Sequence, residues 1–205
     1  GTDFLEAEQQ LHDSHEEELW DSVEVSLSNK EVLTQDEITA GKLVERDWLE
    51  RFSALEVMTL EESKDRYPGA RWIGSRFENN RKDSGEARCR WVIQDFAKTD
   101  GDSLYFTPTP DKAQVELLHI HAAANGLEVR YFDENRAFPH GPELELILTN
   151  APDGCGYPEG SVVRLLRKIN GRRDGSRAYV DYAAAHIQTE VQMEQGRLHP
   201  CGFKK

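Results

Sequence analysis

The sequence contains few cysteines and no motif that would pair them. Its three cysteines, Cys89, Cys155 and Cys201, stand far apart, so neither a disulfide framework nor a zinc site is expected, and a reducing intracellular compartment is the default. No apolar run approaches the roughly 20 residues that cross a bilayer, and we expect no transmembrane segment. The first residue is Gly1 rather than Met, which agrees equally with a trimmed chain and with processing after import into an organelle.

Several catalytic signatures are missing as well. The sequence has no P-loop, no nucleophile elbow, no H-E-x-x-H zinc motif and no dinucleotide-binding fingerprint. A hydrolase site remains open as a hypothesis if His140, Glu143 and Glu145 gather near Asp133.

Positive charge is scarce in the first third of the chain. Residues 1–65 hold 5 basic and 19 acidic side chains, whereas residues 66–205 hold 20 basic and 19 acidic ones. Such an acidic segment repels phosphate backbones, and it is typical of a solvated helix surface or of a surface for a basic partner. Apolar residues at helical spacing predict a narrow stripe that binds a protein partner: Leu19, Trp20, Val23 and Leu27.

The rest of the sequence alternates between helical and strand patterns, which predicts an α+β fold. A capping box, TQDE, opens a helix after Thr34 that runs to Phe52. The later patterns predict a hairpin over 71–96, a helix over 112–126, strands over 127–133, 145–154 and 161–169, and a helix over 182–196.

Basic residues alternate with aromatic residues in the hairpin. This pattern suits nucleic-acid binding, although any two-faced hairpin shows it. A second basic segment lies in the turn NGRRDGSR. The candidate nucleic-acid contacts are Arg76, Arg88, Arg90, Arg172 and Arg173.

In order and spacing, these segments resemble the reverse transcriptase domain of copia-type retrotransposons. The matching stretches are Arg71-Trp72-Ile73, RCRWVIQDF, FTPT, LLHIHAAANGLEVRYF and FDENRAFPHG, followed by VVRLLRKINGRRDGSRAY and the ending HPCGFKK. The resemblance covers about residues 45–205. It implies fingers and a partial palm, an antiparallel sheet with packed helices, preceded by an acidic helical arm over residues 1–44.

The resemblance also implies roles for individual residues. Asp133 would be one of the carboxylates that hold two magnesium ions, Phe138 would pack on the nucleotide sugar, and Arg88 and Arg90 would face the triphosphate. Two-metal phosphoryl transfer needs several carboxylates. The family supplies two of them in a Y-x-D-D hairpin, and the sequence ends at Lys205 before that hairpin.

Tyr179-Val180-Asp181-Tyr182 looks like a substitute for the missing hairpin, but the alignment places it within or at the start of a helix. Two departures from the family, Pro139 and Asp174, point the same way. We therefore expect no catalysis, no metal site and no cofactor, with Mg²⁺ at Asp133 only if the chain polymerises.

These observations favour a non-catalytic domain derived from a reverse transcriptase, a structural or protein-interaction subunit of a larger assembly, for which an organelle is one candidate compartment. Two alternatives stay open. One is the N-terminal portion of an active RNA-dependent DNA polymerase. The other is a non-catalytic nucleic-acid-binding module, because nucleic acid is the less favoured partner but is compatible with the basic hairpin.

Overall fold

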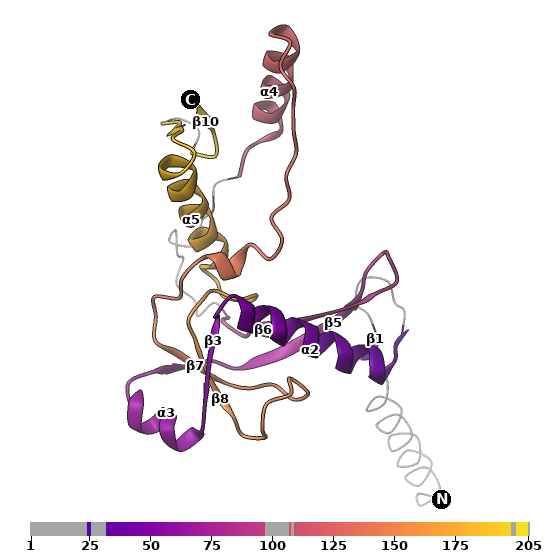
Figure 1. Cartoon of the computed structure of the whole chain (residues 1–205), viewed down its shortest axis with the longest axis vertical. Helices are drawn as coiled ribbons and strands as arrows, with labels where there is room; N and C mark the ends of the chain where they lie inside the picture. The colour runs from indigo at the N-terminus through magenta and orange to yellow at the C-terminus, as the bar shows by residue number, and fades with distance from the viewer. Residues whose placement is uncertain (1–23, 26–31, 97–106, 108, 198–199, 205) are drawn as a thin grey trace, which may run out of the picture.

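A four-stranded sheet, a β-hairpin and a long helix form the body of the protein (Figure 1). The computed structural model describes residues 24–25, 32–96, 107, 109–197 and 200–204. The strands of the sheet lie in the order β3 (Leu55–Met58), β8 (Val162–Leu165), β7 (Ile147–Asn150) and β4 (Arg71–Trp72). The β4 strand runs parallel to β7, and the other neighbours are antiparallel.

The hairpin consists of β5 (Ser75–Arg81) and β6 (Ala87–Ile93), and helix α2 (Gln35–Arg51) packs against β6. Side chains alternate between the two faces of a strand. Accordingly Cys89, Trp91 and Ile93 are buried on one face of β6. Trp91 is fully buried and belongs to the main hydrophobic core together with residues of α2, β7 and β8.

The predicted capping box opens α2. The Thr34 hydroxyl accepts a hydrogen bond from the Glu37 backbone N–H, and the Glu37 carboxylate accepts one from the Thr34 N–H. Arg81 of the hairpin binds the same carboxylate with an Nη1–Oε1 distance of 2.9 Å. Hydrogen bonds from Arg81 and then from Thr34 lower the pKa of Glu37 to about 2. The start of α2 is thereby joined to the hairpin.

The predicted boundary between residues 44 and 45 falls inside α2, and the residues on both sides of it belong to one continuous helix. A short strand, β1 (Glu24–Val25), pairs with β2 (Val32–Leu33), so the expected N-terminal helix does not extend through 24–25. The predicted stripe of Leu19, Trp20, Val23 and Leu27 lies outside the described residues.

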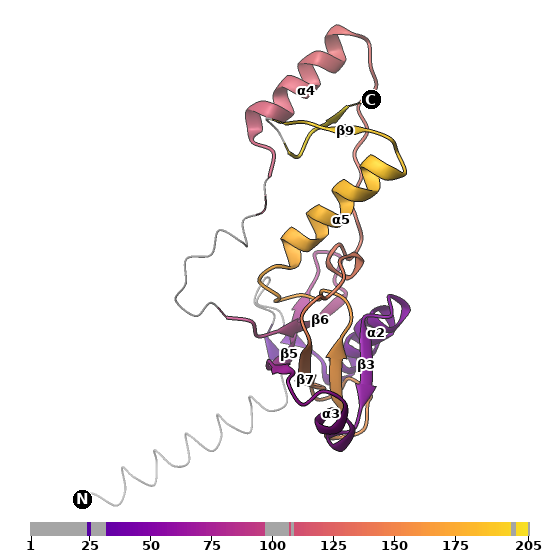
Figure 2. The ribbon, with the colours of Figure 1, turned by 90° about the vertical axis from the view of Figure 1, so that its left-hand side faces the viewer.

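A second group of elements extends away from the body, with α5, the β9–β10 pair and α4 following one another in Figure 2. The elements of this group are α4 (Lys112–Ala124), η2 (Phe138–His140), α5 (Gly175–Thr189), β9 (Glu194–Gln195) and β10 (Phe203–Lys204). The remaining helix, α3 (Leu60–Arg66), lies in the body. None of the described helices is long and apolar enough to cross a membrane.

Most of the predicted elements are confirmed. The hairpin, β7, β8 and the helix that ends before Asn125-Gly126 all form, and Gly126 takes a positive φ of 64° at that helix end. The strand predicted over 127–133 is wrong, because the segment has no neighbouring strand in the described part of the chain. The last helix begins at Gly175 and ends at Thr189, earlier than predicted at both ends.

Candidate functional site

Asp133 lies at the end of an exposed, extended segment that approaches α5. Burial, and then the negative charges of Glu134 and Asp133, raise the pKa of Tyr179 on α5, which places both carboxylates near that hydroxyl. Within the described residues, no cluster of three or more His, Cys, Asp or Glu side chains could hold a metal ion. Asp133 and Glu134 are thus two adjacent carboxylates whose charges act on the Tyr179 hydroxyl.

Phe138, Pro139 and His140 form the short helix η2, which packs on α5. The His140 ring stacks on Tyr182 with 5.6 Å between centroids and meets Phe52 edge-on at 5.0 Å. Its Nε2 atom lies 3.2 Å from a carboxylate oxygen of Glu134. Residues 138–140 thus join α2 to α5 through packed rings, and the half-buried Phe138 belongs to that junction.

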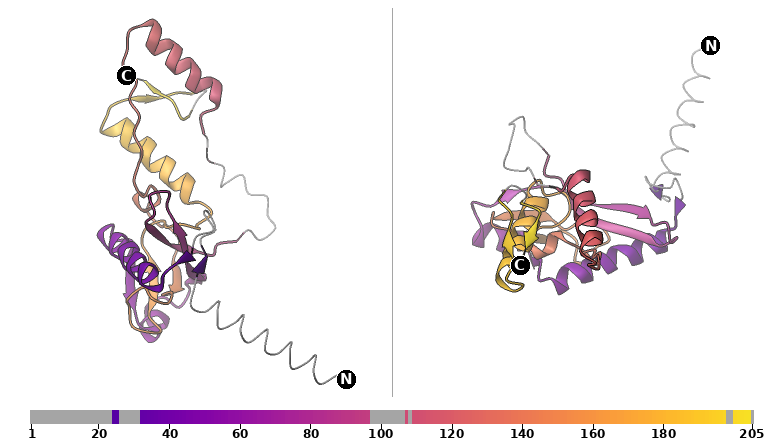
Figure 3. Two further views of the ribbon diagram at one scale, coloured as in Figure 1. Left: turned by 90° about the vertical axis from the view of Figure 1, so that its right-hand side faces the viewer. Right: turned by 90° about the horizontal axis from the view of Figure 1, so that it is seen from above.

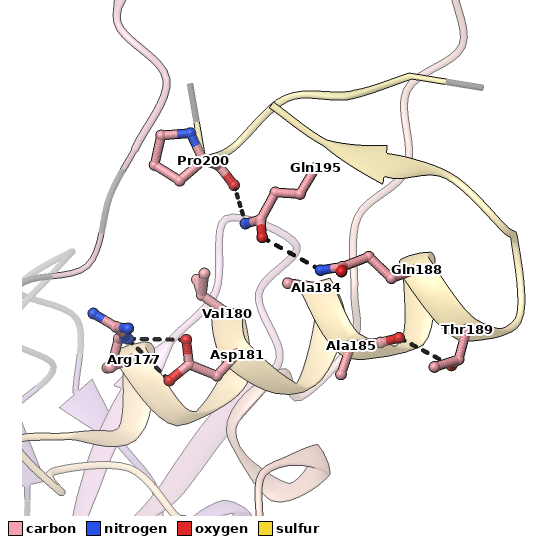
Figure 4. Close-up of a pocket in the computed structure, with 9 residues that line it drawn as sticks. All are labelled: Arg177, Val180, Asp181, Ala184, Ala185, Gln188, Thr189, Gln195 and Pro200. Atoms are coloured by element: carbon pink, nitrogen blue, oxygen red, sulfur yellow. Dashed lines mark hydrogen bonds and ion pairs between the residues drawn. The ribbon is translucent and has the colours of Figure 1, made fainter. Parts of the chain in front are cut away.

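The Y-V-D-Y stretch occurs within α5, as predicted. Asp181 faces Arg177 one turn earlier, with both carboxylate oxygens 2.9 Å from the Arg177 Nε atom. This pair lies on an open pocket of about 680 Å³ between α5 and the residues Gln195 and Pro200, shown in Figure 4. The wall of the pocket also includes Gln188, which donates to Gln195 at 3.3 Å. Apart from the ion pair the lining is uncharged, and it gives no catalytic arrangement.

A buried cluster of charges lies between the body and the start of α5. The Arg172 side chain is only 3% exposed, and its Nε donates to Glu143, whose side chain is fully buried, at 2.8 Å. Its Nη1 atom donates to the buried Asp95 at 2.5 Å. Lys168 also donates to Glu143, at 2.7 Å. Buried charges are stable when they are paired and hydrogen-bonded in this way.

Partly exposed partners complete this charge cluster. Arg71 of β4 joins Asp95 to Glu145, and Asp174 accepts a hydrogen bond from Lys168 at 2.5 Å. Burial alone would lower the pKa of Arg172, but the carboxylates of Glu143, Asp174 and Asp95 raise it above its usual value. The cluster thus ties β4, the end of β6, the loop after η2 and the start of α5 together.

These positions change two sequence-based expectations. All three guanidinium nitrogens of Arg172 bind carboxylates, so its prediction as a nucleic-acid contact is corrected. Arg173 is partly exposed beside it, and its backbone N–H lies 3.4 Å from Asp95. Glu143 and Glu145 bind cations of the cluster rather than meeting Asp133, which removes the basis of the hydrolase hypothesis.

Arg76, Arg88 and Arg90 lie on the outer face of the hairpin, opposite the core. Cross-strand pairing sets Glu78 against Arg90 and Asn80 against Arg88, and Arg76 donates to Glu78 at 3.0 Å. The outer face of the hairpin therefore carries both signs of charge around Arg76, Glu78 and Arg90, and it is basic at the end that holds Arg88.

Arg136 extends the basic end of this face. Burial, and then the charges of Arg90 and Arg136, lower the pKa of Arg88. Arg136 itself binds the buried Glu45 of α2 and lies over the Trp48 ring at 5.2 Å. Arg136 thus binds this buried carboxylate directly, and Arg88 lies near it. Arg136 has a φ of 57°, and nothing in the sequence pattern identified it as a member of this group.

No family model, curated protein or solved structure matches this chain. The likeness to copia-type reverse transcriptases rests on the sequence motifs alone.

Several large apolar side chains of α4 and of the segment that follows it are exposed. Leu117, Leu118 and Ile120 of α4 are 60–64% exposed, and Phe132 is 91% exposed. Of the helix, only Ala122 is buried. In the described part of the chain nothing covers these apolar side chains of α4. Exposed apolar patches of this kind mark interaction sites.

Proposed function

We propose that this chain is a non-catalytic domain derived from a copia-type reverse transcriptase and that it serves as a structural or protein-interaction subunit of a larger assembly. The observation that carries the interaction role is the exposed apolar surface of α4. Three large aliphatic side chains on one short helix expose most of their area to water. Covering a Leu or Ile side chain contributes about 1.5–3 kcal/mol, so a partner that covers all three gains substantially.

The ancestry is supported by those motifs that lie on elements of the implied kind; the implied strand before Asp133 does not form. The basic motif RCRWVIQDF forms β6 of a hairpin, and the Leu- and Ala-rich stretch forms α4. The motif containing Asp133 follows α4 through an extended segment, and VVRLLRKI begins with β8. This order of elements is compatible with fingers and part of a palm.

The non-catalytic interpretation is supported by the surroundings of three positions. Asp133 has Glu134 as its neighbouring carboxylate, and Glu143 and Glu145 bind cations of the charge cluster. Asp174, where the family has a glutamine beside the nucleotide, binds Lys168. Pro139 is the buried residue of η2. A second metal ion would need further carboxylates than these.

The interaction role is tested by isolating the full-length tagged protein from its own cells and measuring the mass and composition of the assembly. We expect a second, different protein in a fixed ratio. The double variant Leu117→Glu and Ile120→Glu should retain about tenfold less of it, because two charges then enter an apolar contact. The control Glu116→Lys alters the charge of an exposed neighbour on the same helix and should retain the partner.

Two results would reject the interaction role: a wild-type protein that migrates alone, or a partner that the double variant retains in full. Co-isolated nucleic acid that Arg88→Gln and Arg90→Gln release would instead favour the nucleic-acid-binding alternative, and such binding should weaken steeply with salt.

A further inference from the structure

Residues 127–132 form an extended segment that leaves the C-terminal end of α4 and turns back towards the body (Figures 1 and 3). The Leu127 N–H donates to the Ala122 carbonyl at 2.8 Å, and the Tyr131 hydroxyl lies 2.5 Å from His119 Nε2. Val129, between them, is partly buried, whereas Glu128, Arg130 and Phe132 are exposed. Leu127 and Tyr131 are exposed as well, so Val129 is the one partly buried side chain of residues 127–132. The two-residue alternation of an extended segment places Leu127, Val129 and Tyr131 on one side, and no strand lies beside the segment in the described regions.

The charges of this segment are complementary to those of a second copy in antiparallel orientation. If two copies pair with Val129 opposite Val129, then Glu128 of each lies opposite Arg130 of the other, and Leu127 lies opposite Tyr131. Opposite charges and aromatic–aliphatic pairs stabilise directly opposed positions on neighbouring strands. If the pairing were centred on residue 128 instead, Glu128 would lie opposite Glu128. If it were centred on residue 130, Arg130 would lie opposite Arg130. The sequence therefore favours a single register.

We propose that two copies of this chain associate through an antiparallel β-ribbon of residues 127–131 centred on Val129. The ribbon would give the unpaired backbone N–H and C=O groups of the segment their partners. The twofold axis of such a ribbon is perpendicular to the plane of its two strands, so the same face of each strand points to the same side of the ribbon. Both α4 helices would therefore lie on one side. Leu117, Leu118 and Ile120 stay available to a different protein, so this dimer goes beyond the proposed function and does not depend on it.

Forming the ribbon would break only a weak ion pair within each copy. In the single chain, Arg130 Nη2 lies 2.9 Å from Glu128 Oε2, and both side chains are about 70% exposed. An ion pair this exposed contributes little to stability, so exchanging it for two pairs between the copies is not opposed by a strong existing contact.

The proposal is tested by sedimentation velocity of the full chain over a concentration series, with Glu128→Arg and Arg130→Glu made separately. The wild type should dimerise. Each variant alone should self-associate about tenfold more weakly or worse, because two attractive pairs become repulsive. An equimolar mixture should form a one-to-one heterodimer, since one variant is basic at both positions 128 and 130, the other is acidic at both, and each position faces the other across the ribbon.

The control Glu159→Arg changes an exposed charge in the loop before β8 and should dimerise as the wild type does. The proposal is overturned if the wild type stays monomeric at the highest concentration reached, if either single variant dimerises as tightly as the wild type, or if the mixture associates no better than its components. None of these results bears on the partner of α4, which is measured with different variants in a native assembly.

Discussion

Replacing Arg172 with alanine is expected to lower the free energy of unfolding by about 3–5 kcal/mol, because it leaves buried carboxylates without their cation. Glu143 loses the contact at 2.8 Å and Asp95 the contact at 2.5 Å. Lys168 remains beside Glu143 and Arg71 beside Asp95. Neither of them binds both carboxylates at once, as the planar guanidinium group of Arg172 does. Denaturation in urea, analysed with a common m-value, measures the difference.

Arg177→Ala is the matched control for this prediction. Arg177 also binds a carboxylate, that of Asp181 one turn further along α5, but the two side chains are 46% and 59% exposed. Such a pair contributes about 0.3–0.5 kcal/mol. If Arg172→Ala and Arg177→Ala cost the same within about 1 kcal/mol, the charge cluster does not hold the body and α5 together as described.

Gly171→Ala is expected to cost about 2–5 kcal/mol through two separate effects. Gly171 has a φ of 84°, where an L-residue is disfavoured by about 1–2 kcal/mol. A Cβ atom there would also overlap the Ile93 carbonyl oxygen and lie 2.6 Å from a methyl carbon of Val92. The clash adds about 1–3 kcal/mol, and relieving it would disturb the hydrogen bond from the Ile93 N–H to the Asn170 carbonyl.

Gly85→Ala separates the two effects. Gly85 has nearly the same φ, 86°, but a Cβ atom there would meet nothing within 4 Å. We expect it to cost only the conformational part, about 1–2 kcal/mol. Equal losses in thermal or chemical denaturation at the two positions would show that the loop at Gly171 does not lie closely against β6.

The elements that the sequence predicted well are those fixed by neighbouring residues. The TQDE pattern specifies a capping box through contacts three residues apart, and the box forms at Thr34. The hairpin depends on alternation and on a turn between adjacent segments, and it forms as well. The segment over 127–133 has the alternation of a strand, but a strand also needs a neighbour, which local pattern does not supply.

The charge cluster could not be predicted, because its members are distant in the sequence. Arg172 and Asp95 are 77 residues apart, and the residues around Arg172 read locally as a basic, exposed turn. The exposure of α4 could not be predicted from the sequence for a related reason. Helical periodicity shows which side chains are apolar, but it does not show whether another part of the molecule covers them.

The proposed loss of catalysis is tested most directly by templated primer extension in Mg²⁺ with the natural full-length protein isolated from its own cells, beside the Asp133→Asn form. If the domain is non-catalytic, as proposed, neither form should extend the primer, because two-metal phosphoryl transfer needs a set of carboxylates and the described residues contain no such metal-binding cluster. Extension by the natural protein that disappears in Asp133→Asn would contradict this account and identify the chain as part of an active polymerase.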